Sequence, residues 1–175
     1  MKIIDLSQPL YDKMPVYPGD PEVSINEIHT IGKEGWNLRN MTLTTHIGTH
    51  VNVPYHMVAS GEKLDAFPLD RFIGQTALYR KGMTMKRNKG VIFSFNTIDK
   101  DIVEQIIKQR PKFIGLSDKF TFDIALEKQL LEAGIISYEN VTHTEKLPLA
   151  FMFYGVPLNI KESDGSPVRA FAVVY

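Results

Sequence analysis

Cysteine is absent from the 175 residues of this chain, and its absence excludes several kinds of chemistry. There is no disulfide, no thiolate nucleophile and no cysteine-ligated zinc site. Any metal ion must therefore be bound by His, Asp, Glu, Asn or backbone oxygen atoms. The sequence also lacks a Gly-x-Ser-x-Gly motif, which disfavours acyl transfer through a serine nucleophile.

An excess of charge of one sign is also missing, because 20 basic side chains balance 20 acidic ones. This balance argues against a nucleic-acid partner, which requires a basic surface. No apolar run is long enough to cross a bilayer, and the first ten residues do not form a signal peptide, so we expect no membrane partner. The sequence predicts a cytoplasmic protein with a single domain over residues 1–175.

Short strand-forming segments outnumber helical ones. Segments rich in β-branched and aromatic residues, bounded by Gly, Pro, Asn or Asp, predict strands. They cover residues 2–7, 23–31, 38–45, 76–80, 91–95, 113–116, 135–139, 151–157 and 168–174. Without a regular alternation of strands and helices, the pattern indicates an α+β fold, a sandwich or partly closed barrel flanked by helices.

Two helices are predicted from apolar stripes with helical spacing. The first covers residues 101–109 and ends before Pro111. The second runs from about Asp123, a candidate N-cap, to Gly134, a residue type that commonly follows a helix. A third, shorter helix is expected near residues 69–73.

Three of the five histidines lie within residues 46–56, His-Ile-Gly-Thr-His-Val-Asn-Val-Pro-Tyr-His. If this segment is extended, side-chain alternation places four polar residues on one face, opposite a core-facing row. They are His46, His50, Asn52 and His56. Three imidazoles on one face favour a functional site over unrelated surface histidines.

Two histidines four residues apart cannot share a metal ion on a flat strand. They would be separated by roughly 13 Å, whereas metal–nitrogen bonds of about 2 Å require the rings to converge. His46 and His50 therefore need a bend between them, and Gly48 is the residue that permits it. His50 and Asn52, two residues apart, converge more easily.

Two glutamates stand out elsewhere in the chain. Glu127 lies on the apolar stripe of the second predicted helix, where a carboxylate is costly unless it is paired, protonated or bound to a metal. Alternatively, Glu127 lies at the edge of the stripe and reaches solvent or a basic partner. Glu139 ends an apolar run, where active sites commonly present polar groups, although a solvated strand end would look the same.

The segment at residues 46–56 resembles the signature of the Putative cyclase family, which includes bacterial kynurenine formamidase and isatin hydrolase. That signature is His-x-Gly-Thr-His-x-Asp-x-Pro-x-His, and this chain departs from it at one fixed position, Asn52. Residues 4–10 and 14–21 are similar to the opening of the family. Residues 130–135 and the Asp-Gly-Ser-Pro-Val-Arg-Ala sequence at 164–170 are similar to its C-terminal part.

The resemblance implies a β/β/α swivel-type fold, a β-rich core flanked by a few helices, with one or two divalent ions. Zn²⁺ is expected first and Mn²⁺ second. By position in the motif, His46, His50 and Asn52 would be metal ligands and His56 the general acid/base. A glutamate and a helix residue twelve positions before it would complete the site. These positions correspond to Glu139, as ligand or catalytic group, and Glu127, which stands where the family has a histidine.

The departures from the family pattern leave two functions open. The Asn52 amide is neutral and seldom bridges two ions, whereas Glu127 adds a negative charge where the family has a histidine. The two changes together move a carboxylate from position 52 to position 127. We expect a kynurenine formamidase-like hydrolase of an amide bond (N-formyl amide, cyclic amide or lactone) acting through a metal-activated water. The alternative is a degenerate member that binds metal or ligand without hydrolysis. It is favoured by both substitutions and by the short middle of the chain.

The expected partners are a small-molecule substrate and further copies of the same chain. The resemblance implies a homodimer or homotetramer. Two apolar runs, at residues 151–154 and 171–175, are suited to a subunit contact, although burial in the core of the chain explains them equally well.

Overall fold

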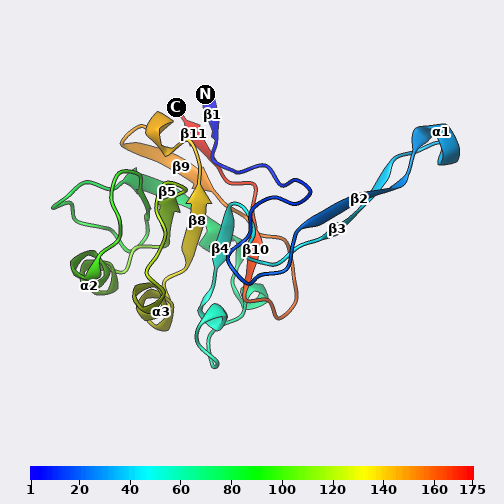
Figure 1. Cartoon of the computed structure of the whole chain (residues 1–175). Coiled ribbons are helices and arrows are strands. Elements are labelled where there is room, and N and C mark those ends of the chain that lie inside the picture. Colours follow the sequence, from blue (N-terminus) through cyan, green and yellow to red (C-terminus); the bar gives the residue numbers. More distant parts are fainter.

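A computed structural model describes all residues, 1–175, and its centre is a nine-stranded mixed sheet (Figure 1). The strand order is β1-β11-β9-β5-β6-β7-β8-β4-β10, and β2 and β3 form a separate two-stranded sheet. The strands are β1 (Lys2–Asp5), β2 (Ser24–His29), β3 (Leu38–Thr42), β4 (His50–Asn52), β5 (Ile73–Leu78), β6 (Gly90–Phe93), β7 (Ile114–Ser117), β8 (Ser137–Val141), β9 (Ala150–Tyr154), β10 (Gly165–Pro167) and β11 (Phe171–Val174).

The large sheet combines parallel and antiparallel pairing. Strands β5, β6, β7 and β8 are parallel to one another. On one side of these four strands, β4 pairs with β8 and β10 pairs with β4, each antiparallel to its neighbour. On the other side, β9 pairs with β5, β11 with β9 and β1 with β11, again each antiparallel to its neighbour. With only three α-helices, this arrangement confirms the predicted α+β fold.

The helices follow from local signals that the sequence carries. They are α1 (Ile31–Glu34), α2 (Lys100–Gln109) and α3 (Ile124–Glu132). Helix α2 begins after Asp99, whose carboxylate accepts from the Ile102 N–H. Helix α3 begins after Asp123, whose carboxylate accepts from the N–H groups of Ala125 and Leu126, as predicted. The segment near 69–73 forms a short 3₁₀ helix, Leu69–Phe72.

The two larger apolar cores lie on the two faces of the sheet. One core packs α2 and α3 against side chains of β6 and β7, including Phe93 and Leu116. The other contains an aromatic group, Phe113, Tyr138 and Phe153, with ring centroids 4.9–5.5 Å apart. The apolar runs in β9 and β11 are largely buried within the chain itself. Core packing therefore accounts for them.

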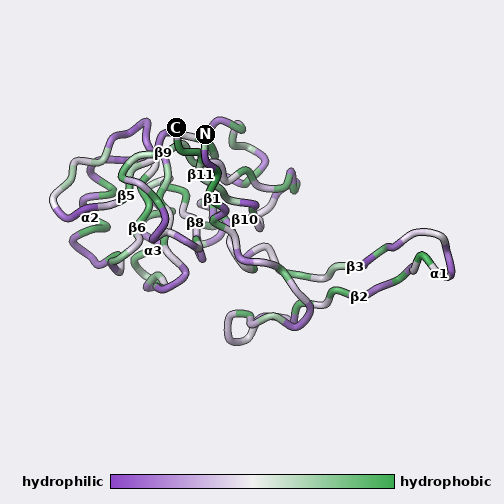
Figure 2. The backbone as a smooth tube through the Cα atoms, turned by 90° about the horizontal axis from the view of Figure 1, so that it is seen from above, coloured by the Kyte–Doolittle hydropathy of each residue, from purple (hydrophilic) through white to green (hydrophobic).

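A hairpin that we call the arm, residues 24–42, projects away from the sheet (Figures 1 and 2). It consists of β2, the short helix α1 at its tip and β3. Every residue of β3 is exposed, and α1 has no buried residue. The exposed side chains of the arm include several large apolar ones, namely Ile28, Ile31, Trp36, Leu38 and Met41. The arm contributes to neither of the two larger cores, and only Ile25 at its base packs against a small third cluster of Met14, Val23 and Ile47.

No helix combines the length and the apolar character that crossing a lipid bilayer requires. Nine predicted strand segments are present, with ends shifted by a few residues. The short strands β4 and β10, which pair with each other, were not among them. They matter because they bring the histidine segment beside the C-terminal part of the chain.

Candidate active site

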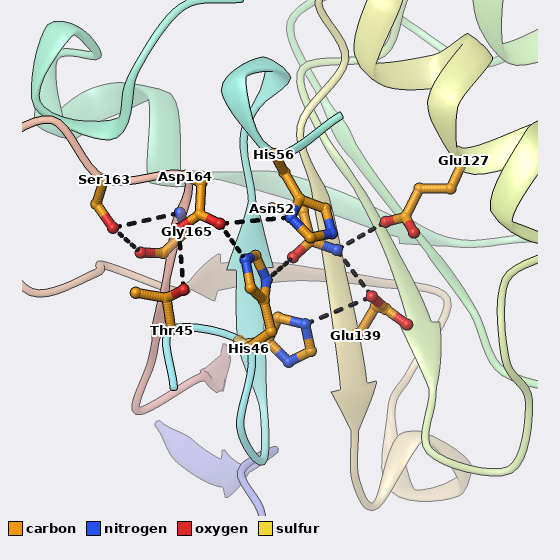
Figure 3. A network of polar contacts seen from close by, with 10 residues as sticks. Thr45, His46, Asn52, His56, Glu127, Glu139, Ser163, Asp164 and Gly165 are labelled. Atoms are coloured by element: carbon orange, nitrogen blue, oxygen red, sulfur yellow. Dashed lines mark hydrogen bonds and ion pairs between the residues drawn. The ribbon is translucent and has the colours of Figure 1, made fainter. Parts of the chain in front are cut away.

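Seven polar side chains from distant parts of the chain converge at one edge of the sheet, around β4 (Figure 3). Strand β4 lies between β8 and β10, so the pairing of these three strands brings the groups together. The seven are His46 from the turn before β4, His50 and Asn52 from β4, His56 from the 3₁₀ helix Pro54–His56, Glu127 from α3, Glu139 from β8 and Asp164 from the segment before β10.

The expectation of one extended segment over residues 46–56 is wrong. Residues 45–49 form a turn, only His50–Asn52 is strand, and Pro54–His56 is a 3₁₀ helix. The expected bend at Gly48 is present: its φ is +59°, in the left-handed region that glycine adopts without strain. The bend brings the His46 and His50 rings to 5.3 Å between centroids. The histidines therefore converge through chain reversal and not through strand parity.

His50 is buried and held in one orientation by the backbone. Its Nδ1 lies 2.9 Å from the Gly48 carbonyl oxygen, to which it donates. The N–H is thereby assigned to Nδ1, and Nε2 faces inward, 3.4 Å from Glu139 Oε1. Histidines that bind metals commonly donate their outer N–H to a carbonyl or carboxylate in this way.

His46 has an oxygen acceptor at each of its ring nitrogens. Its Nε2 lies 2.8 Å from Asp164 Oδ2, and its Nδ1 lies 2.7 Å from Asn52 Oδ1. A neutral imidazole has one N–H and satisfies only one of these acceptors. Burial lowers the pKa of His46, but the hydrogen bond and charge of Asp164 outweigh it and raise the pKa above its ordinary value. A positive charge, either a proton or a metal ion, is favoured here.

Glu127 is only 4% exposed, so it neither reaches solvent nor lies at the edge of the helix stripe. Its Oε1 accepts from Asn52 Nδ2 at 2.7 Å and from Ser137 Oγ at 2.9 Å, and no Lys or Arg pairs with it. Burial, followed by the charge of Glu139, raises the pKa of Glu127. The costly position noted in the sequence is thus maintained by neutral hydrogen-bond donors.

Glu139 completes the inner part of the cluster. Its Oε1 accepts from Asn52 Nδ2 at 2.8 Å and faces His50 Nε2. Burial raises the pKa of Glu139, but its contact with His50 outweighs burial and lowers the pKa below its ordinary value. Glu139 and His50 are also direct partners in the β4–β8 pairing, which explains their contact.

Asp164 is the site residue that sequence reasoning did not assign. Its Oδ2 lies 2.8 Å from His46 Nε2 and 3.5 Å from His56 Nδ1, and its Oδ1 accepts from Thr45 Oγ1 at 2.9 Å. The hydrogen bonds from His46 and His56 hold its pKa far below the ordinary value for aspartate. The available signal was its place in the Asp-Gly-Ser-Pro sequence at 164–167. That sequence resembles the family, but the resemblance did not assign a role to Asp164.

The donor set suits a divalent cation in either of two places. One group of donor atoms, from His46, His56 and Asp164, lies within 4.8 Å of one another. The inner group joins His46 Nδ1 and His50 Nε2 with the oxygens of Asn52 and Glu139. In the inner group the orientation of both rings is suited to binding an ion. There the outer nitrogens are already held by Asp164 and Gly48, so their lone pairs face inward as ligands.

A cavity of about 860 Å³ opens onto these side chains. Its floor includes all three histidines of the cluster, Glu127 and Glu139. The walls are largely apolar or aromatic and come from the loop before the arm and from residues 121–124. They include Tyr11, Met14, Tyr17, Phe122 and Ile124. Neither Lys nor Arg lines the cavity. Its size and lining are typical of a small-molecule site.

Comparison with known proteins gives a consistent result. A family model described as Putative cyclase matches residues 4–112. A kynurenine formamidase of Salinibacter ruber is 24% identical and the match covers 97% of this chain and 96% of that protein. A kynurenine formamidase of Bacillus cytotoxicus is 25% identical, with 95% of each chain covered.

Solved structures share the fold. A potential metal-dependent hydrolase with cyclase activity superposes with a TM-score of 0.81 at 20% identity, covering 98% of this chain and 96% of the other. Isatin hydrolase A from Labrenzia aggregata superposes with a TM-score of 0.80 at 17% identity, covering 99% and 93%. These likenesses confirm the architecture expected from the sequence.

Proposed function

We propose, from the premise that this chain belongs to the Putative cyclase family, that it is a metal-dependent hydrolase of amide bonds. The bond would be an N-formyl amide, as the kynurenine formamidase relatives suggest by name, or a cyclic amide or lactone. The kinship supports a hydrolase, and the choice of bond and metal is the proposal.

The observation that carries this proposal is the orientation of His46 and His50. Their outer ring nitrogens contact Asp164 and the Gly48 carbonyl, and their inner nitrogens face oxygen atoms. A cation between these inner atoms would be bound by nitrogen and oxygen lone pairs. His46, His50 and Asn52 Oδ1 would be its ligands, with Glu139 and Glu127 on the far side. Two imidazoles with oxygen donors suit Zn²⁺ first and Mn²⁺ second.

Such an ion, when bound, acidifies a water molecule and polarises a carbonyl group. The proton transfer is assigned to His56, which lines the cavity. Because Asp164 Oδ2 lies near its Nδ1, at 3.5 Å, the carboxylate orients the ring. Nε2 of His56 is then the atom that accepts a proton from the attacking water and returns it to the leaving amine. Glu139 orients His50 or contributes an oxygen ligand.

The cavity supports a small substrate with an apolar or aromatic body. Tyr11, Tyr17 and Phe122 offer flat apolar surfaces, and no Lys or Arg is present to pair with a substrate carboxylate. An aryl formamide or an uncharged cyclic amide fits this lining better than a substrate with free acid groups.

A second function, binding without hydrolysis, is favoured by one observation. All hydrogen-bonding atoms of the Asn52 amide are already paired, with His46, Glu127 and Glu139. A cluster that satisfies itself has less need of a cation. Metal content and turnover separate the two functions.

The test is to measure metal per chain by mass spectrometry after reconstitution with Zn²⁺ or Mn²⁺, followed by assays with aryl formamides and cyclic amides. Stoichiometric metal and turnover that chelation abolishes would support the hydrolase. Metal without turnover of any of these amides would support the binding function. A chain that takes up neither ion would contradict the proposed function.

We also propose that the chain forms a homodimer or homotetramer. The arm supports this, because a two-stranded hairpin is marginal in water by itself, and several of its large apolar side chains are exposed. A second copy is the partner to which we assign this surface.

A further inference from the structure

We infer that the Asn52 amide takes the place of a second cation, so that the site binds one divalent ion per chain and not two. This inference rests on the proposed function and concerns the two sides of one side chain. Asn52 is fully buried in β4, between the imidazoles and the two glutamates (Figure 3).

The two ends of the amide face different groups. Oδ1 lies 2.7 Å from His46 Nδ1, on the side of the imidazoles. Nδ2 lies 2.7 Å from Glu127 Oε1 and 2.8 Å from Glu139 Oε1, on the side of the carboxylates. The amide therefore divides the cluster into an imidazole side, which offers lone pairs to an ion, and a carboxylate side, where N–H donors are already present.

The NH₂ group of Asn52 stabilises two buried carboxylates by donating a hydrogen bond to each, as a cation between them would stabilise them by its charge. Without Asn52, Glu127 would keep only the Ser137 hydroxyl as a donor, and no N–H group would lie between the two buried carboxylates. Asn52 supplies one N–H to each. Metal–oxygen bonds to Zn²⁺ are about 2.0–2.2 Å, so an ion bound to both carboxylate oxygens would occupy the volume that Nδ2 fills.

Turning the amide over does not open a second site at low cost. Oδ1 would then face two carboxylate oxygens with no N–H group among the three acceptors, and buried acceptors that lose their donors are destabilising. Ser137 Oγ donates to Glu127 as well and leaves that carboxylate still better satisfied. The orientation of Asn52 is thus determined by its neighbours.

An aspartate at position 52 would favour a second cation. It would remove both N–H donors and place a third carboxylate beside Glu127 and Glu139. Three buried carboxylates favour a cation strongly, because oxygen-rich sites of high negative charge bind divalent ions. Asn52→Asp should therefore create the second site that the natural chain lacks.

The experiment measures ions per chain by mass spectrometry and calorimetry, using the full chain stripped with a chelator and then titrated with Zn²⁺ or Mn²⁺. We expect one ion for the natural chain and two for Asn52→Asp. The matched control is Asn88→Asp, the same chemical change at an exposed position outside the site, which should bind one ion. Mn²⁺ electron paramagnetic resonance provides a second readout, since only two neighbouring ions give an exchange-coupled spectrum.

The outcomes separate the inference from the proposed function. Two ions in the natural chain, or one in folded Asn52→Asp, would overturn the inference and leave a metal-dependent hydrolase intact. No ion in the natural chain would overturn both. If Asn52→Asp does not fold, the stoichiometry and the spectrum of the natural chain decide the question by themselves.

Discussion

Asp164 stands behind the imidazoles and not among the inward-facing ligands, and this position determines what its loss should do. We expect Asp164→Asn to keep the bound ion with an affinity reduced by roughly tenfold to a hundredfold, since groups that orient metal ligands have effects of this size. We expect kcat to fall while KM changes little, because His56 loses the carboxylate beside its Nδ1. Complete loss of metal would instead place the ion among His46, His56 and Asp164.

His50 should behave differently, because its Nε2 is one of the inward-facing nitrogens. We expect His50→Ala to lose stoichiometric metal while retaining the circular dichroism spectrum of the folded chain. His143→Ala, at an exposed position, is the matched control and should keep its metal. Full metal content in His50→Ala would show that this imidazole is not a ligand.

The metal-free protein should have a characteristic dependence on pH. The pKa of His46 is raised, so its contribution to stability is present below about pH 6.5 and is lost as pH rises through the raised value. The pKa of Asp164 is lowered, so its contribution is present above about pH 4 and is lost only in stronger acid. We therefore expect the free energy of unfolding in chelator, measured with urea, to decline from pH 6 to 9. The decline should be smaller in His46→Gln.

The sequence was sufficient to predict that the residues of the histidine segment form a site, but it predicted their arrangement only in part. The spacing of His46 and His50 with Gly48 between them demanded a bend, and the bend is present. The parity argument failed because a turn and a 3₁₀ helix interrupt the strand. Asp164 was not predicted as a site residue because its contact with His46 spans 118 positions and depends on the pairing of β4 with β10.

At the scale of elements, local signals were sufficient where they repeat over several residues. The apolar stripe of α2 and the N-cap of α3 are examples, and both are confirmed. Strands β4 and β10 have three residues each, too few for a period to be recognised. The arm strands were predicted as strands, but nothing in their local sequence says that they leave the body of the molecule.

Helix α3 positions Glu127, so weakening its start should affect the site. We expect Asp123→Ala to lower the free energy of unfolding by about 1 kcal/mol through loss of the N-cap. The matched control is Asp99→Ala, which removes the N-cap of α2 at a similar cost. Only Asp123→Ala should reduce catalytic activity, because α2 contributes no residue to the cluster. Equal losses of activity in both variants would indicate a general effect of stability.

At the scale of the whole molecule, the arm determines how copies associate in the proposed oligomer. We expect replacement of Ile31 and Trp36 by Ser to reduce the molar mass measured by light scattering, because both side chains are exposed at the tip region of the arm. Leu69→Ser, which changes an exposed apolar residue outside the arm, should leave the mass unchanged. An unchanged mass in the arm variant would mean that copies associate elsewhere or not at all.

Trp36 is the single tryptophan of the chain, and it is 59% exposed on the arm, next to the His29 ring at 5.6 Å. Its indole emission therefore responds to what surrounds the arm and hardly to the state of the sheet. A blue shift on raising the protein concentration would report docking of the arm against another copy. Loss of the β-rich body would instead be followed through Tyr138 and the other tyrosines, so the chain carries separate optical reporters for association and for unfolding.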